Sequence, residues 1–198
     1  MEKKHRRSLR LKDYEYSQAG AYFITICTNN SECIFGEIIN SEVRLSPFGK
    51  IIQMEWCNIP KRFPNVQLDV FVIMPNHLHG IIIINNVEIC RGNPCGYPIN
   101  NSNRYPNERA GTSPAPTLGK IIGAFKSLCI HGFMTHSLNS DKLWQRNYYE
   151  HIIRNEKELN RIRDYIQNNP LRWELDRENP ISKNFNLDHD TYWKEVYG

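Results

Sequence analysis

Two histidines separated by one residue are the part of this sequence best suited to chemistry. His77 and His79 flank Leu78 inside residues 68–84, the most apolar stretch of the chain. The β-branched and aromatic residues around them predict a buried strand. Because side chains alternate along a strand, both imidazoles should point to the same face. Unpaired polar groups are costly to bury, and a divalent metal held by both rings is one reason to place them there. A structural metal site or a satisfied core pair would also explain them.

A tyrosine and an asparagine on a later helix form a second candidate group. The capping pattern that starts at Asn155 and closes at Glu158 predicts a helix over residues 156–169. Tyr165 and Asn169 are four positions apart in it, so they should lie about one turn from each other on nearly the same face. Taken alone, a Tyr at this place, on the edge of the apolar stripe, is more often a half-buried core residue than a nucleophile.

The elements that must position these groups belong to a mixed α and β chain. Strands are expected at 21–28, in a hairpin at 33–45, around the two histidines, and at 143–154. Helices are expected to begin at Ser46-Pro47 and near Thr117. Asn, Pro, Gly and Ser crowd residues 85–116, which predicts a loop or an insertion there. The expected order is strand, hairpin, helix, strand, helix, strand, helix.

Composition and charge narrow the classes of protein further. The chain has 198 residues with 40% hydrophobic and 23% charged side chains, which suits one globular domain. Of its net charge of +4, residues 1–12 carry +5, with six basic side chains against Glu2. Such a basic arm suits a polyanion such as nucleic acid, and a solvated tail explains it equally well. With no signal peptide and no apolar run of ~18 residues, we expect no membrane association and a cytoplasmic protein with reduced cysteines.

Three segments in combination resemble a known family. They are Met74-Pro75-Asn76-His77-Leu78-His79, residues 144–154, and Tyr165-Ile166-Gln167-Asn168-Asn169-Pro170. Together they resemble the IS200-like tyrosine transposases of the HUH/Y1 type (U stands for a hydrophobic residue), and most closely the REP-associated tyrosine transposases. The resemblance extends from about Tyr22 to Trp173.

The resemblance implies an α+β fold of the ferredoxin-like or RRM-like kind, an antiparallel sheet with helices packed on one face. It divides the chain into a basic N-terminal arm at 1–20, a transposase-like domain at 21–173 with a variable polar loop at 85–116, and a C-terminal tail at 174–198. It also implies that the enzyme cleaves and rejoins single-stranded DNA at hairpin-bearing repeats, as a monomer or homodimer.

The resemblance also implies a role for each matching residue. His77 and His79 would bind a divalent metal, Mg²⁺ or Mn²⁺, with Asn169 as the third ligand. Tyr165 would be the nucleophile and form a 5′-phosphotyrosine intermediate, leaving a free 3′-OH. There are eight candidate DNA contacts, although a cation of this kind is more often a solvated charge than a specific contact: Arg6, Arg7, Arg10, Lys120, Lys126, Arg146, Arg154 and Arg163. Possible supporting residues are Gln145, Glu150 and His151.

Two other functions fit the same residues. One is a non-catalytic nucleic-acid-binding module of RRM-like fold, because one fold serves many functions. The other is a phosphodiesterase that uses a metal and water and leaves Tyr165 structural. A covalent protein–DNA adduct would distinguish the transposase-like enzyme from both.

Overall fold

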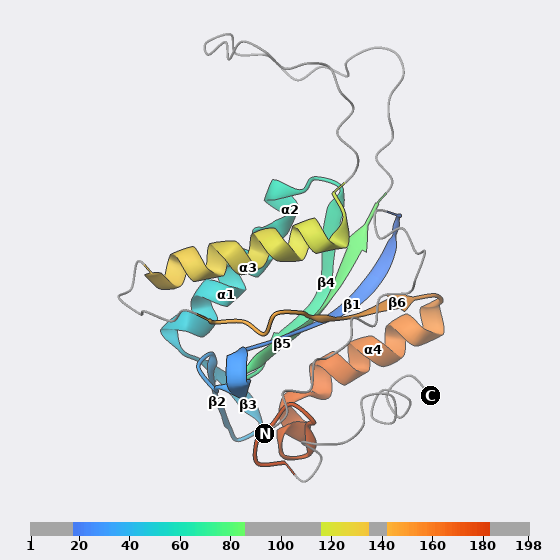
Figure 1. Ribbon diagram of the computed structural model, residues 1–198. Helices are drawn as coiled ribbons and strands as arrows, with labels where there is room; N and C mark the ends of the chain where they lie inside the picture. Colours follow the sequence, from blue (N-terminus) through green and yellow to red (C-terminus); the bar gives the residue numbers. More distant parts are fainter. Residues whose placement is uncertain (1–17, 86–115, 135–141, 183–198) are drawn as a thin grey trace, which may run out of the picture.

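The computed structural model describes residues 18–85, 116–134 and 142–182, and within these ranges one antiparallel sheet organises the chain (Figure 1). Its strand order is β4-β5-β1-β6. The central pair, β1 and β5, runs in unbroken register from Gly20 opposite Ile84 to Cys27 opposite His77. The strands span Gly20–Cys27 (β1), Val66–Ile73 (β4), His77–Ile84 (β5) and Tyr149–Ile153 (β6). The basic arm to residue 17, residues 86–115 and residues 183–198 lie outside the described ranges.

A separate hairpin is formed by β2 (Gly36–Ile39) and β3 (Glu42–Leu45), as the sequence predicts. Asn40 and Ser41 connect the strands with φ of 51° and 64°. Positive φ at both central residues is the backbone of a type I′ turn, whose twist matches that of paired strands.

The helices begin at residues that cap them. Ser46 accepts a hydrogen bond from the Gly49 N–H ahead of α1, and Asn155 accepts one from the Glu158 N–H ahead of α4. Pro170 ends α4 and starts a 3₁₀ helix, η2. The helical segments span Asn29–Ser31 (η1), Pro47–Cys57 (α1), Ile59–Arg62 (α2), Leu118–Met134 (α3), Glu156–Asn168 (α4) and Pro170–Leu175 (η2).

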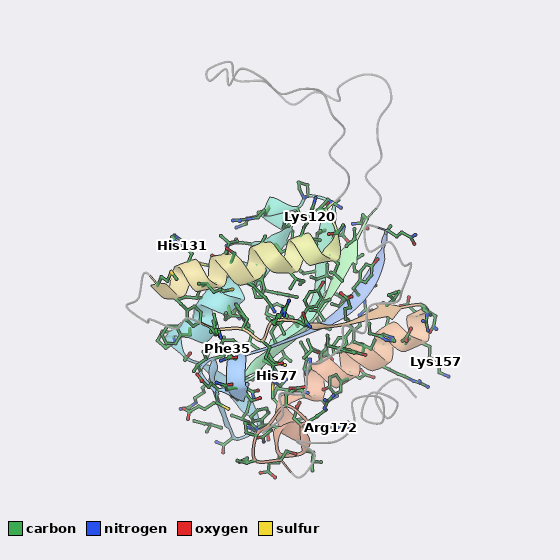
Figure 2. The ribbon with its side chains drawn as sticks, viewed as in Figure 1. Phe35, His77, Lys120, His131, Lys157 and Arg172 are labelled. Atoms are coloured by element: carbon green, nitrogen blue, oxygen red, sulfur yellow. The ribbon has the colours of Figure 1, made fainter. Side chains whose placement is uncertain are left out.

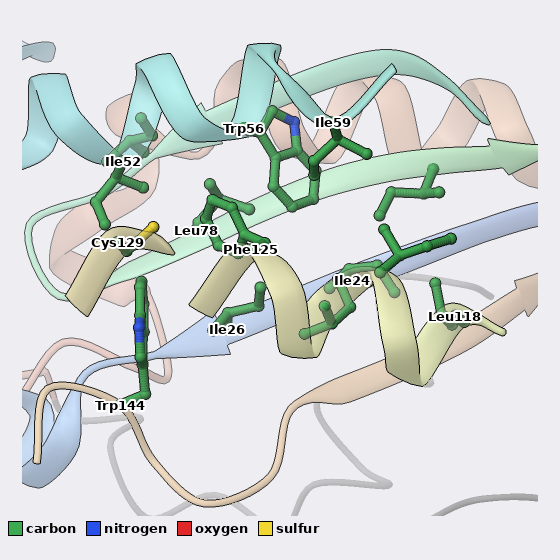
Figure 3. Packing of buried hydrophobic residues seen from close by; sticks show 14 of the residues in the cluster. Ile24, Ile26, Ile52, Trp56, Ile59, Leu78, Leu118, Phe125, Cys129 and Trp144 are labelled. Atoms are coloured by element: carbon green, nitrogen blue, oxygen red, sulfur yellow. The ribbon is translucent and has the colours of Figure 1, made fainter. Parts of the chain in front are cut away.

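The larger core lies between the sheet and the helices α1 and α3 (Figure 3). Even-numbered β5 residues such as Leu78 and Ile82 face it, and Trp56 and Phe125 meet edge to face at its centre. Gly80 lets the indole approach the strand, because a Cβ at this position would lie 2.5 Å from Trp56 Cζ2. The strand that carries the histidines is therefore held firmly from behind.

A smaller core lies on the opposite face of the sheet, under α4 (Figure 1). There Ile162 and Ile166 of α4 pack against Phe23 and Ile81. The α+β class and the antiparallel sheet are as predicted. The expectation of helices on one face fits α1 and α3 but not α4, which covers the other face. The physical reason is that β1 and β5 are apolar on both sides and both sides need cover.

Candidate active site

His77 and His79 lie at the start of β5 on the face that α4 covers. Both side chains are fully buried, and their ring centroids are 4.4 Å apart. The prediction that they share one face is thus confirmed. Figure 2 shows His77 in the interior of the molecule, whereas the labelled Lys120, Lys157 and Arg172 lie at its periphery.

Hydrogen bonds on the inner ring nitrogens orient both imidazoles. Asn76 uses its Nδ2 to donate to the Ser31 and Glu178 carbonyls, so its Oδ1 is the acceptor that lies 2.8 Å from His77 Nδ1. His77 therefore carries its proton on Nδ1 and has a lone pair on Nε2. Likewise, Thr25 Oγ1 lies 2.8 Å from His79 Nδ1 and leaves His79 Nε2 pointing away from the strand pair. Such outer contacts fix the orientation of a metal-binding imidazole.

Asp176 completes the cluster. It follows η2 and is 2% exposed, and its Oδ2 lies 3.9 Å from His77 Nε2. One ligand atom from each of His77, His79 and Asp176 lies within 4.8 Å of the other two, so the group could hold a metal ion. His77 Nε2 is buried without a hydrogen-bond partner in the described structure. A lone pair and a carboxylate oxygen that face each other with no proton between them fit a shared cation.

Electrostatics keeps the two imidazoles neutral. Burial lowers the pKa of His77, and the nearby carboxylates of Asp176 and Glu178 oppose this shift. Burial also holds the pKa of His79 well below its ordinary value, and the neighbouring His77 lowers it further. Neutral imidazole is the form that binds metals, so both rings are ready to act as ligands near pH 7.

Tyr165 reaches this cluster from α4 of the same chain. Its hydroxyl lies 3.2 Å from His79 Nε2, although the two residues are 86 positions apart in sequence. The Tyr165 ring meets Phe23 edge to face at 6.1 Å, and Phe23 in turn stacks on the His79 ring at 5.4 Å. Phe23 therefore fixes both the phenol and the imidazole from one position in β1.

Asn169 also lies beside the cluster, at the C-cap of α4 and 1% exposed. Its Nδ2 donates to Asp176 Oδ2 at 2.9 Å, and its Oδ1 is buried without a partner among the described residues. In this arrangement Asn169 orients the Asp176 carboxylate. Direct coordination by its Oδ1, as the resemblance implies, stays a prediction.

The structure gives different surroundings to the cations predicted to contact DNA. Lys126 Nζ donates to the carbonyls of Gln145 and Asn147, and Arg163 is paired with Asp69. Burial lowers the pKa of Lys126 to about 8. Three others are exposed, namely Lys120, Arg146 and Arg154. Arg6, Arg7 and Arg10 lie outside the described residues.

The three supporting candidates lie in and just before β6 and connect it to neighbouring elements. The Gln145 N–H donates to the Cys27 carbonyl, and this bond attaches the segment before β6 to the end of β1. His151 Nε2 lies 2.7 Å from Glu158 Oε1 and links β6 to the first turn of α4. Glu150 is 9% exposed and pairs with Ile24 across the strands.

Sequence reasoning missed Asp176, Thr25 and Asn76 as members of the site. Asp176 lies beyond residue 173, and no periodicity marks its segment; the six-residue η2 turn is what returns it to the histidines. Asn76 was visible in the histidine motif, but its role depends on which of its side-chain atoms is an acceptor. Thr25 carried no signal in the sequence, because threonine is common in strands and the pairing of its strand with the one that carries His79 was not known.

Comparisons with known proteins agree with this fold. A solved structure of a REP-associated tyrosine transposase bound to a REP hairpin aligns with a TM-score of 0.55 and 16% identity, covering 83% of this chain and 74% of that one. A candidate transposase from Deinococcus radiodurans aligns with 14% identity over 80% of this chain and 95% of that one, but its TM-score of 0.40 is too low to carry an argument. The resemblance to IS200-like tyrosine transposases is thus confirmed at the level of the fold.

By sequence, this chain is closely similar to an uncharacterized protein of Haemophilus influenzae. The two are 49% identical over 174 residues, which cover 87% of this chain and 92% of the other. The chain belongs to the same family as that Haemophilus influenzae protein. No family model matches the sequence. Among the described residues, no helix has the length and apolar character needed to span a bilayer.

Proposed function

We propose that this protein is a metal-dependent, tyrosine-transposase-like enzyme that cleaves and rejoins single-stranded DNA at hairpin-bearing repeats. The observation that carries the proposal is the 3.2 Å contact between the Tyr165 hydroxyl and His79 Nε2, a member of the buried metal-binding group. A tyrosine that serves only packing does not have to lie beside a metal-binding group. A nucleophile must lie there, because the ion would bind the scissile phosphate that it attacks. Both halves of the site come from one chain, so a single protomer would contain the whole of it.

The residues that would hold the ion are His77 and His79 through Nε2 and Asp176 through Oδ2, with Asn169 Oδ1 as a further oxygen donor. Mixed nitrogen and oxygen donors suit Mn²⁺ and, with more water ligands, Mg²⁺. When bound, such an ion would polarise the scissile phosphate and offset its developing charge.

The chain's own groups would then exchange one ester bond for another. The deprotonated Tyr165 oxygen attacks phosphorus, a bond forms between them, and the bond from phosphorus to the 3′ oxygen breaks. The products are a 5′-phosphotyrosine and a leaving 3′ oxygen, which takes up a proton and becomes a free 3′-OH. In the reverse step a 3′-OH from another strand attacks the phosphotyrosine and releases the phenol. The number of phosphate esters is unchanged, so rejoining needs no ATP.

One aromatic residue beside the site has a property suited to unpaired DNA. The Trp173 ring lies 6.1 Å from the His77 ring and is half-buried, and an aromatic side chain at this place could stack a base. The relative of similar fold is itself bound to a REP hairpin, which suggests the same kind of substrate.

The test is incubation of the full-length protein with end-labelled, hairpin-bearing single strands and Mn²⁺, followed by a denaturing gel. We expect an adduct that survives denaturation and maps to Tyr165 by mass spectrometry. Tyr165→Phe should abolish the adduct and still bind the same strand. If Tyr165→Phe formed as much adduct as the wild-type protein, the assignment of Tyr165 as the nucleophile would be refuted. Cleavage without an adduct would favour the water-using phosphodiesterase, and binding without cleavage the non-catalytic module.

A further inference from the structure

A bulge in β4 places an acidic side chain against the helix that carries Tyr165. Leu68 pairs with Ile82 and Phe71 pairs with Gly80, so Asp69 and Val70 together oppose the single residue Ile81. Leu68 and Phe71 both face the α1/α3 core, although alternation would put residues three apart on opposite faces. The extra residue therefore turns Asp69 and Val70 together toward α4.

Asp69 uses this position to bind Arg163 of α4 through both carboxylate oxygens. Arg163 Nη2 donates to Oδ2 at 2.6 Å, and its Nε lies 3.2 Å from each oxygen. Arg163 Nη1 donates to Asn160 Oδ1, and the Val70 N–H donates to Asp69 Oδ1, so both partners are held from their own elements as well. The hydrogen bond from Arg163 lowers the pKa of Asp69, which keeps the pair ionised at neutral pH.

This pair adds a directional contact to the apolar packing of α4. Ile162 and Ile166 hold α4 on the sheet through hydrophobic contacts, which are non-directional. A two-pronged contact between a planar guanidinium and a carboxylate has a defined geometry. Arg163 precedes Tyr165 by two residues, about 3 Å along the helix axis.

We propose that the Asp69–Arg163 pair is a positioning device that sets the Tyr165 hydroxyl at its distance from His79. This inference rests on the proposed strand-transfer function and names residues that act through Tyr165 rather than on DNA. Because Asp69 already neutralises Arg163, the pair does not serve as a free cation for a phosphate.

The test uses Asp69→Asn, Arg163→Gln and the double variant in the full-length protein. Single-turnover rates of adduct formation are measured with excess protein, and DNA affinity is measured separately in the Tyr165→Phe background. We expect each single change to slow the adduct step by about 10- to 100-fold, because small misplacements of a reacting group cost rates of this order. The double variant should be no slower than the slower single, and DNA affinity should stay within about twofold.

Glu158→Gln is the matched control. It removes the charge from the contact between Glu158 and His151 at the other end of α4, seven residues before Tyr165, and should leave the adduct rate near wild type. An equal slowing by Glu158→Gln would mean that general helix stability matters and would overturn the proposal. So would additive effects of the two single changes, or weaker DNA binding in Arg163→Gln alone.

A second measurement does not need activity. With 3-fluorotyrosine at position 165, Asp69→Asn should shift or broaden the ¹⁹F resonance, whereas Glu158→Gln should leave it in place. An unchanged resonance in Asp69→Asn would overturn the positioning role even if no adduct is ever formed. If the wild-type protein forms no adduct but Asp69→Asn still changes the ¹⁹F resonance, the strand-transfer function is refuted. The role of the Asp69–Arg163 pair in positioning Tyr165 would then still stand.

Discussion

Asp176 is the residue whose replacement tests the metal site most directly. Its Oδ1 accepts the Glu178 N–H at 2.6 Å, and its Oδ2 accepts Asn169 Nδ2 and faces His77 Nε2. In Asp176→Asn the new amide oxygen can keep the Glu178 bond. The new NH₂ can donate to Asn169 once that amide turns its buried, unpartnered Oδ1 toward it. The variant should therefore fold with nearly the wild-type free energy of unfolding and lose a charged metal ligand.

The size of the effect follows from ligand linkage. Mn²⁺ at about 100 times its dissociation constant raises the free energy of unfolding by about 2.7 kcal/mol. Loss of a direct ligand should weaken binding by at least about 100-fold, the upper end of what outer contacts cost. The same Mn²⁺ concentration would then add only about 0.4 kcal/mol. For a chain of this size these values correspond to shifts in Tm of about 5–11 °C and about 1–2 °C.

The assay is thermal and urea unfolding of the full-length protein with and without Mn²⁺, together with calorimetric titration. Glu178→Gln is the control, because it removes a charge two residues away whose Oε2 accepts the Cys27 thiol and which does not belong to the group of His77, His79 and Asp176 that could hold a metal ion. It should retain most of the Mn²⁺ shift. If Asp176→Asn keeps the full shift, or Glu178→Gln loses it, the ligand assignment is wrong.

Three further predictions concern the residues around the site. Thr25→Val removes the oxygen beside His79 Nδ1 and should weaken Mn²⁺ binding by about 10- to 100-fold in the same titration, whereas equal affinity would exclude a role in orienting the ring. Gly80→Ala forces a Cβ to 2.5 Å from Trp56 and should cost about 1–3 kcal/mol in urea unfolding, while Gly123→Ala, with nothing within 4 Å, should cost nothing or stabilise. The Lys126 pKa falls from 10.5 to about 8 because burial penalises the charged form, so Lys126 by itself should add about 3 kcal/mol to the free energy of unfolding as pH rises from 8 to 10.5, and nothing below pH 8. Lys126→Met should lack that rise in pH-dependent unfolding, and an identical pH profile would contradict it.

The local features of the sequence predicted the local features of the fold well. The Asn155 cap and the helical spacing after it placed Tyr165 and Asn169 on one helix, and strand alternation placed His77 and His79 on one face. These rules act over a few residues, so a sequence states them directly.

Long-range pairing was harder to foresee. The sequence does not reveal the partners of Arg163 and Lys126. Asp69 is 94 positions from Arg163, and the partners of Lys126 are backbone carbonyls. The second covered face of the sheet was visible in principle. Phe23 beside Tyr22 and Ile24 makes β1 apolar on both sides, which indicates a strand covered twice.

The histidine half and the tyrosine half of the site are held by different kinds of contact. The imidazoles belong to a central strand with neighbours on both sides, and Gly80 packs that strand against Trp56. Polar contacts with Asp69, with His151 and with Asp176 help to hold the helix that carries Tyr165. The last of these belongs to the metal-binding group itself. An ion that draws Asp176 toward the histidines would therefore also act on the end of the tyrosine helix through Asn169, and would couple metal binding to the placement of the proposed nucleophile.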